Sequence, residues 1–145
     1  MSAALGIALV ILLAAVLVAL EMAIGHRAVS SLRDVVPDVD KILPKVSIIV
    51  AARNEQRNIR EALQSLLNLS YPDYELIVVN DRSEDDTQSI LEQMSAHEQR
   101  LKLLQVNELP TGWLGKNHAL WAGSQHATGE ILLFTDADII MEPGA

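Results

Sequence analysis

Two aspartates, Asp136 and Asp138, follow directly on the apolar run Ile131–Phe134 near the C-terminal end of the sequence. In extended backbone, side chains two residues apart point to the same side, so both carboxylates can face one ligand while Ala137 packs behind them. A carboxylate pair at the end of a strand suits a hard divalent cation that also binds phosphate oxygens. The spacing therefore predicts a metal site that serves a phosphorylated ligand.

Two further acid-bearing segments follow apolar runs in the same way, Ala51–Glu55 and Asn80–Ser83. A carboxylate in such a segment can accept a hydrogen bond from the N–H of a uracil ring or from ribose hydroxyls. Each segment alone has an ordinary explanation. An Asp-x-Asp motif is more often a solvated turn than a metal site, and Glu55 suits the first turn of a helix because of the helix dipole. Only the occurrence of all three segments at strand ends indicates a ligand site.

Strand-like and helix-like patterns alternate from Lys45 to the last acidic pair. The expected strands are Val46–Val50, Glu75–Val79, Leu101–Val106 and Ile131–Thr135, and the expected helices are Glu55–Leu69, a helix with Ser83 as N-cap and Asp86 as its capping-box acid, and Lys116–Ala127 followed by Gly129. This alternation predicts a parallel sheet with right-handed crossovers, in which ligands bind beyond the carboxyl ends of the strands.

The N-terminal segment Ala3–Leu20 is an uninterrupted run of apolar residues and one glycine. As a helix it would be about 27 Å long, close to the hydrocarbon thickness of a bilayer. A cleaved signal peptide is the alternative, but no Lys or Arg precedes the run and it is longer than a usual signal core. Basic residues only follow it, which places the N-terminus outside and the rest in the cytoplasm. We expect a transmembrane anchor in the cell (inner) membrane over residues 1–25, a juxtamembrane linker over 26–44 and a soluble part over 45–145.

Length and composition limit the function classes. A chain of 145 residues can hold one soluble domain and one membrane segment. The formal net charge of −8 argues against a nucleic-acid partner. Because there is no cysteine, disulfides and thiolate metal sites are excluded. The four histidines lack the spacing of a metal-binding cluster.

Four stretches resemble the family 2 glycosyltransferases, which have the GT-A fold: Val46–Glu55, Leu76–Thr87, Gly112–Gly123 and Glu130–Asp138. The resemblance implies an α/β, Rossmann-like GT-A parallel sheet, present in part, behind one transmembrane helix. The segment Gly112–Lys116 looks most like the membrane-linked members, among them the hopanoid-associated and carotenoid-type enzymes. Asn80 departs from the family pattern, where an aspartate is common, and we therefore assign a role only to Asp81.

The same resemblance implies a set of site residues. The substrate-binding residues would be Ala52, Glu55, Asp81, Lys116 and Asp136, and the metal ligands would be Asp138 and Asp136. Glu55 and Asp81 would hold the base and ribose, and Asp138 would ligate Mn²⁺ or Mg²⁺ on the diphosphate. Lys116 would lie near the phosphates, with a solvated lysine at a helix start as the equal alternative. The expected partners are a nucleotide-sugar donor, a UDP-sugar in the first instance, a membrane, and an acceptor for which a lipid is one option.

The reaction that these residues would serve is displacement of a nucleoside diphosphate from the anomeric carbon of a sugar. A cation held by Asp138 would stabilise the charge on the departing diphosphate. The acceptor hydroxyl also needs a general base, and Glu142, the only acid after Asp138, is a poor candidate. We expect that the donor-binding half is present and that the base lies further along the chain. Two hypotheses follow, a membrane-anchored glycosyltransferase and a truncated donor-binding module without turnover. A dinucleotide-binding domain is disfavoured because Ala51–Glu55 contains no glycine.

Overall fold

The computed structural model describes residues 3–28 and 43–144. The chain divides into two compact units, Met1–Lys41 and Ile42–Ala145, and each is described by itself. The expected linker over 26–44, with its helix-breaking Pro37, falls largely on residues 29–42, which lie outside the described residues.

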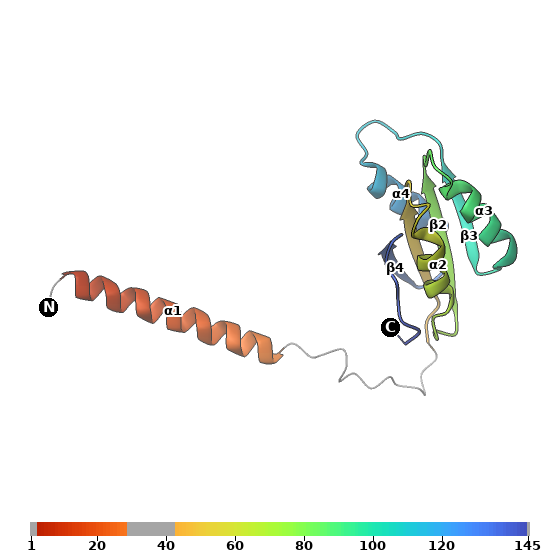
Figure 1. Ribbon diagram of the computed structural model, residues 1–145. Helices are drawn as coiled ribbons and strands as arrows, with labels where there is room; N and C mark the ends of the chain where they lie inside the picture. Colours follow the sequence, from red (N-terminus) through yellow and green to blue (C-terminus); the bar gives the residue numbers. More distant parts are fainter. Residues whose placement is uncertain (1–2, 29–42, 145) are drawn as a thin grey trace. The chain divides into compact units, whose positions relative to one another are not determined.

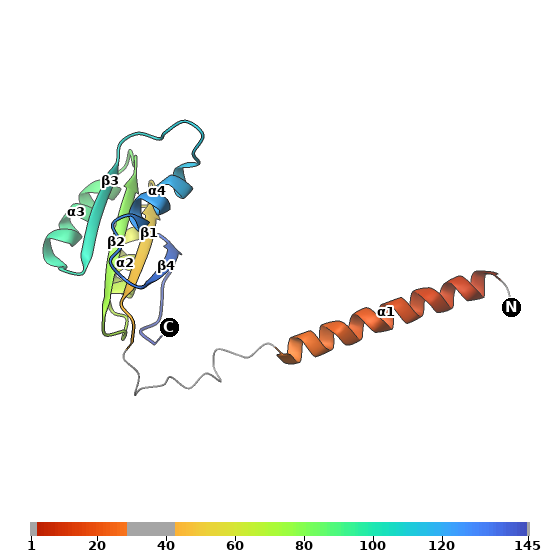
Figure 2. The same ribbon diagram turned by 180° about the vertical axis from the view of Figure 1, so that it is seen from behind.

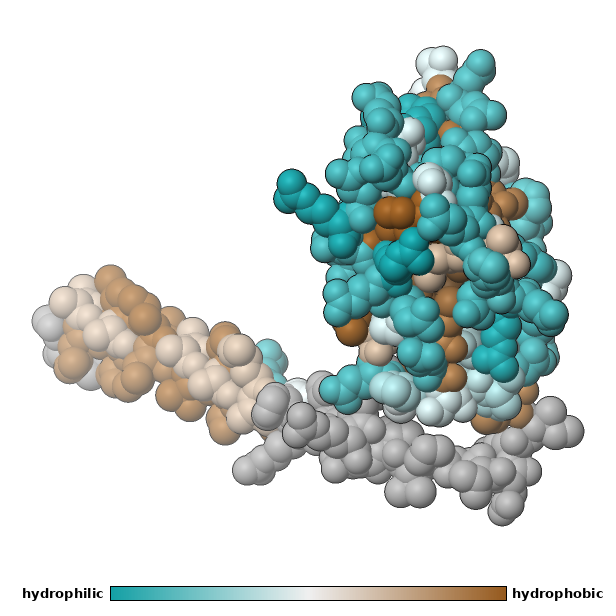
Figure 3. All heavy atoms as spheres, turned by 45° about the vertical axis from the view of Figure 1, so that its right-hand side comes forward, coloured by the Kyte–Doolittle hydropathy of each residue, from teal (hydrophilic) through white to brown (hydrophobic). Residues whose placement is uncertain are grey.

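The first unit contains helix α1, Ala3–Ala28. Its segment Ala3–Gly25 is long and apolar enough to cross a membrane, and none of it is buried against protein. Figure 3 shows hydrophobic side chains covering this helix, whereas the visible face of the second unit is mainly hydrophilic. Length and composition therefore agree with the predicted anchor, although an N-terminal signal sequence meets the same description.

The second unit is built on a parallel sheet of four strands (Figure 1). The strands are β1 (Val46–Ala52), β2 (Tyr74–Asp81), β3 (Leu101–Val106) and β4 (Ile131–Asp136), in the order β3-β2-β1-β4. Every neighbouring pair is parallel. The four predicted strands and the predicted α/β architecture are thus confirmed.

Helices cover both faces of this sheet, as Figures 1 and 2 show together. Helices α2 (Ile59–Leu67) and α3 (Thr87–His97) pack with Ile48 and Val50 on one face, and α4 (Gly115–Ser124) packs with Ile49 on the other. Alternate residues of β1 therefore contribute to two separate cores, as the two-residue period of a strand requires. This explains why β1 is continuously apolar from Ile48 to Ala52 rather than alternating.

The direction of winding reverses between β1 and β4. The chain passes from β1 to β2 and β3 in one direction across the sheet, and then α4 carries it back to the other side of β1. The carboxyl ends of β1 and β4 lie side by side at this reversal. In open parallel sheets, this switch point is where ligands bind.

Two predicted helix starts are wrong. Helix α2 begins at Ile59 and not at Glu55, because a turn comes first, in which Asn58 N–H donates to the Glu55 carbonyl over 3.1 Å. Ser83 is not an N-cap. Its hydroxyl accepts from Asn54 N–H instead, and α3 begins at Thr87. Both helices start late because the preceding residues bind the neighbouring loop and not their own helix.

The predicted end of the third helix is also wrong, because α4 stops at Ser124 and not at Ala127. Gly129 acts after the helix, at the entry to β4. A Cβ atom added there would lie 2.6 Å from Ser47 N and 2.8 Å from the Lys45 carbonyl oxygen. The glycine is required by this close backbone approach and not by a helix cap.

A buried carboxylate connects the strands at the other end of the sheet. Glu75 accepts hydrogen bonds from Ser47 Oγ at 2.6 Å, Lys102 Nζ at 2.6 Å and Thr128 N–H at 2.7 Å. Burial alone would raise the pKa of Glu75, but these donors outweigh burial and lower the pKa to about 2. The ionised carboxylate thus joins β1, β2, β3 and the connection that leads into β4.

Candidate active site

A cleft of about 340 Å³ lies at the carboxyl ends of β1, β2 and β4, at the switch point of the sheet. Its lining residues are Ala51, Ala52, Arg53, Glu55, Asp81, Gly115, Lys116, Asp136, Ala137 and Asp138. The structure therefore brings all six predicted site residues to one cavity. They come from four separate segments of the chain, which explains why each motif alone is a weak signal.

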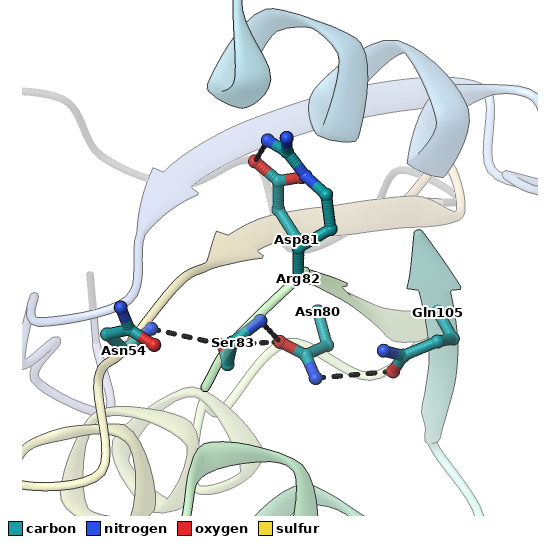
Figure 4. A network of polar contacts seen from close by, with 6 residues as sticks. All are labelled: Asn54, Asn80, Asp81, Arg82, Ser83 and Gln105. Carbon is teal, nitrogen blue, oxygen red and sulfur yellow. Dashed lines mark hydrogen bonds and ion pairs between the residues drawn. The ribbon is translucent and has the colours of Figure 1, made fainter. Parts of the chain in front are cut away.

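The loops after β1 and β2 are held together by a polar network (Figure 4). Asn54 N–H donates to Ser83 Oγ over 3.0 Å, and the Ser83 hydroxyl donates to Asn80 Oδ1 over 2.5 Å. Asn80 is fully buried, and its amide nitrogen donates to Gln105 Oε1 on β3 over 3.2 Å. Asn80 thus supports the loops from below and does not line the cleft, in agreement with the choice of Asp81 as the site residue.

Glu55 faces other acids across the cleft. Its backbone N–H donates to Thr87 Oγ1 over 2.8 Å, which holds the residue between the two loops. Burial raises the pKa of the Glu55 carboxyl, and repulsion by Asp138, Asp85 and Asp136 raises it further. The carboxylates of three segments therefore lie close enough to interact, and a bound cation would relieve their repulsion.

Asp81 is buried beside the neighbouring arginine. Arg82 Nε lies 2.8 Å from Asp81 Oδ1, and Arg82 Nη2 lies 3.1 Å from Oδ2, so the guanidinium binds both carboxylate oxygens. The hydrogen bond to Asp81 raises the pKa of the Arg82 guanidinium. A Cβ atom added to Gly115 would lie 2.6 Å from Asp81 Oδ2, so α4 begins directly against this ion pair. The pair and the glycine were not predicted. The signal for the pair was an arginine directly after a strand-end aspartate.

Lys116 lines the cleft, and its side chain is exposed to solvent. Its Nζ is 2.5 Å from Asp136 Oδ1, and each side chain is more than half exposed, at 58% and 54%. Such an exposed ion pair contributes little to folding stability. Its importance is that a cationic group already lies beside one of the two predicted metal ligands.

Asp136, the last residue of β4, and Asp138 have the alternation that their spacing predicts. Ala137 is buried at 4% exposure, whereas Asp136 and Asp138 are both exposed. Within residues 3–28 and 43–144, no side chain donates a hydrogen bond to Asp138, and no three His, Cys, Asp or Glu side chains form a ready metal cluster. Two carboxylate ligands are nevertheless a usual protein contribution for Mg²⁺, which takes its other oxygens from phosphate and water.

The chain is similar to known proteins in sequence and in fold. The family model described as Glycosyl transferase family 2 matches residues 47–145. The chain is 38% identical over 100 residues to the probable glycosyltransferase YdaM of Bacillus subtilis. This alignment covers 68% of this chain and 24% of YdaM. It is 40% identical over 98 residues to the beta-monoglucosyldiacylglycerol synthase of Trichormus variabilis. This alignment covers 66% of this chain and 20% of the synthase.

Solved structures show the same relationship. The mannosyltransferase PcManGT from Pyrobaculum calidifontis, in complex with GDP-Man and Mn²⁺, has a TM-score of 0.62 at 37% identity over 72% of this chain and 30% of that chain. S. aureus TarS 1-349 in complex with UDP has a TM-score of 0.56 at 33% identity over 69% of this chain and 29% of that chain. This chain therefore spans less than a third of each of these two structures, and about a quarter or less of the two curated relatives.

Proposed function

Because the chain belongs to glycosyl transferase family 2, we propose that its cleft binds the nucleoside diphosphate of a sugar donor for transfer to an acceptor. The observation that supports this most strongly is the convergence of Glu55, Asp81, Asp136 and Asp138 on one cleft at the switch point of the sheet. The family comprises enzymes of glycosyl transfer. This chain spans only a fraction of the length of its relatives, so transfer of the sugar to an acceptor is part of the proposal.

In the proposed complex, Asp81 and Glu55 accept hydrogen bonds from the base and the ribose. Ala52 is 1% exposed and has no polar side chain, so it contributes an apolar part of the cleft wall near Glu55 and Asp81. Glu55 is predisposed to this role, because its raised pKa makes hydrogen-bond donors from a ligand favourable partners for the carboxylate. The polar network of Asn54, Asn80 and Ser83 holds the loops after β1 and β2 in place before any ligand enters.

The diphosphate would lie at the β4 end of the cleft. Asp138 and Asp136 fit a hard divalent cation, Mn²⁺ or Mg²⁺, because they offer only oxygen ligands and one of them already attracts an ammonium group. When bound, the cation would offset the negative charge that grows on the departing diphosphate. Lys116 would remain beside Asp136 and add a second positive charge at the same position. A neighbour in the family, PcManGT, is seen with Mn²⁺.

Membrane attachment is proposed from the first unit. Helix α1 is long and apolar enough for one span, and the basic residues that follow it favour a cytoplasmic location for the cleft. Within the family, one relative is a beta-monoglucosyldiacylglycerol synthase and another is a GalNAc(5)-diNAcBac-PP-undecaprenol beta-1,3-glucosyltransferase, and both names contain a lipid. We therefore propose a lipid acceptor at the membrane surface.

Calorimetry with the full chain in nonionic detergent tests the donor site. We expect UDP or GDP to bind in the presence of Mn²⁺ and to lose about tenfold or more in affinity without it. Asp138→Ala should remove this metal dependence. Asp73→Ala is the matched control, because Asp73 is exposed near the opposite end of the sheet, outside the cleft. If Asp138→Ala binds with unchanged metal dependence, the proposed metal role is wrong.

A further inference from the structure

The Asp81 carboxylate reaches the cleft with both oxygens already bound by Arg82, at 2.8 Å and 3.1 Å (Figure 4). A carboxylate offers about four lone pairs, and a two-pronged guanidinium uses one on each oxygen, along the edge between them. The lone pairs that remain point away from this edge. Asp81 can therefore accept one further N–H from a ligand, but it cannot accept two parallel donors.

Two features hold this arrangement in place. Neighbouring side chains of an extended strand point to opposite sides, so the left-handed backbone of Arg82, with φ of 56°, is what lets its side chain fold back onto Asp81. On the other side, Gly115 closes the space, since a Cβ there would lie 2.9 Å from Arg82 Nη2. The Asp81 side chain is only 4% exposed and the Arg82 side chain 25%.

We propose that Arg82 is a specificity-determining residue that selects a donor whose base presents a single N–H to Asp81, as uracil does, and rejects guanine. Guanine presents two parallel donors, its ring N–H and its exocyclic amino group, and these need the carboxylate edge that Arg82 occupies. This inference rests on the proposed function, because it places the base against Asp81. The choice is a real one within the family, where one structure contains UDP and another contains GDP-Man.

The size of the preference follows from the hydrogen bonds at stake. Guanine must either leave one donor unpaired in the cleft or displace the guanidinium, and both options cost binding free energy. A good two-donor contact to a base typically discriminates by about tenfold or more. We therefore expect the chain to bind UDP at least about tenfold more tightly than GDP.

The test is calorimetric titration of the full chain in nonionic detergent with UDP and with GDP, each in the presence of Mn²⁺. Arg82→Gly removes the guanidinium, and glycine adopts the left-handed backbone freely, so this variant keeps the local backbone conformation. The preference for UDP should fall to about threefold or less. Arg82→Lys keeps the charge without the two-pronged contact and should show the same loss. Arg57→Ala removes an equal charge from an exposed turn outside the cleft and should keep the wild-type ratio.

The outcomes separate the two proposals. If the chain binds UDP and GDP equally, or if both Arg82 variants keep the wild-type ratio, the role of Arg82 is wrong while the donor site stands. If the chain binds neither nucleotide with Mn²⁺, the proposed function is wrong and the role of Arg82 with it. A ratio that changes in the two Arg82 variants and not in the Arg57 variant supports the inference.

Discussion

Replacing Glu75 by glutamine removes a buried charge from the end of the sheet opposite the cleft. Glu75 is 5% exposed, and its carboxylate accepts hydrogen bonds from Ser47, Lys102 and Thr128. Burial raises its pKa, but the three donors outweigh burial and lower the pKa from 4.5 to about 2. The folded chain therefore stabilises the ionised form of Glu75 more than the unfolded chain does.

The magnitude follows from this lowered pKa, which corresponds to about 3 kcal/mol of folding stability at neutral pH. Because the folded-state pKa lies below the unfolded value, this contribution is complete above pH 4.5 and is lost as the pH falls toward 2. Lys102 is half exposed, at 49%, so water screens part of its contribution. We expect Glu75→Gln to lower the free energy of unfolding at pH 7 by about 2 to 3 kcal/mol.

Urea unfolding of the full chain in nonionic detergent measures this difference. The two tryptophans, Trp113 and Trp121, lie in or next to α4 and provide the fluorescence signal. Glu130→Gln is the control, since it removes the same charge from an exposed position just before β4 and should change stability by about 0.5 kcal/mol or less. A Glu75 variant as stable as the wild type at pH 7, or a stability difference equally large at pH 3, would refute the reasoning.

Two other predictions concern packing and charge. Gly123→Ala should destabilise the second unit by about 1 to 3 kcal/mol in urea unfolding, because its Cβ would lie 2.6 Å from Ile49 Cγ2, whereas Gly6→Ala meets no atom within 4 Å and should have no effect. Equal midpoints for the two variants would contradict the packing argument. Glu55→Gln should stabilise the metal-free chain at pH 7 and lose this advantage at pH 4. The pKa of Glu55 is raised in the folded chain, so its ionised carboxylate lowers the folding stability at neutral pH, and glutamine removes that charge. Mn²⁺ should reduce the gain, and a gain independent of both pH and Mn²⁺ would exclude repulsion by Asp138 as a cause.

Much of the fold could be predicted because its signals are local. β1 and β2 contain the continuous apolar runs Ile48–Ala52 and Leu76–Val79, as strands that are buried on both faces require. β3 and β4 lie at the edges of the sheet and are more exposed, but both are short segments rich in apolar residues. The helix ends could not be predicted, because long-range hydrogen bonds decide them. Ser83 has the sequence of an N-cap, but its hydroxyl is used by Asn54 and Asn80 from outside its own helix. A capping motif and a loop contact require the same residue type, so the sequence cannot separate them.

The candidate site shows the same division. The acids at Glu55, Asp81, Asp136 and Asp138 were predicted because strand ends of a parallel sheet meet at one edge, and this rule needs only the order of the elements. The contact between Arg82 and Asp81, and the glycine against it, depend on one left-handed residue and on where α4 begins. These are properties of backbone direction in three dimensions.

The sequence by itself therefore determined the alternation of elements, the apolar N-terminal helix and the edge of the sheet that carries the acids, because each follows from residue type and period along the chain. Only the tertiary structure decided that the reversal lies between β1 and β4, that Glu75 is ionised and buried, and that Arg82 occupies one edge of Asp81. In each of these cases, residues distant in sequence or a single backbone angle set the environment of a charge, and no local pattern records it.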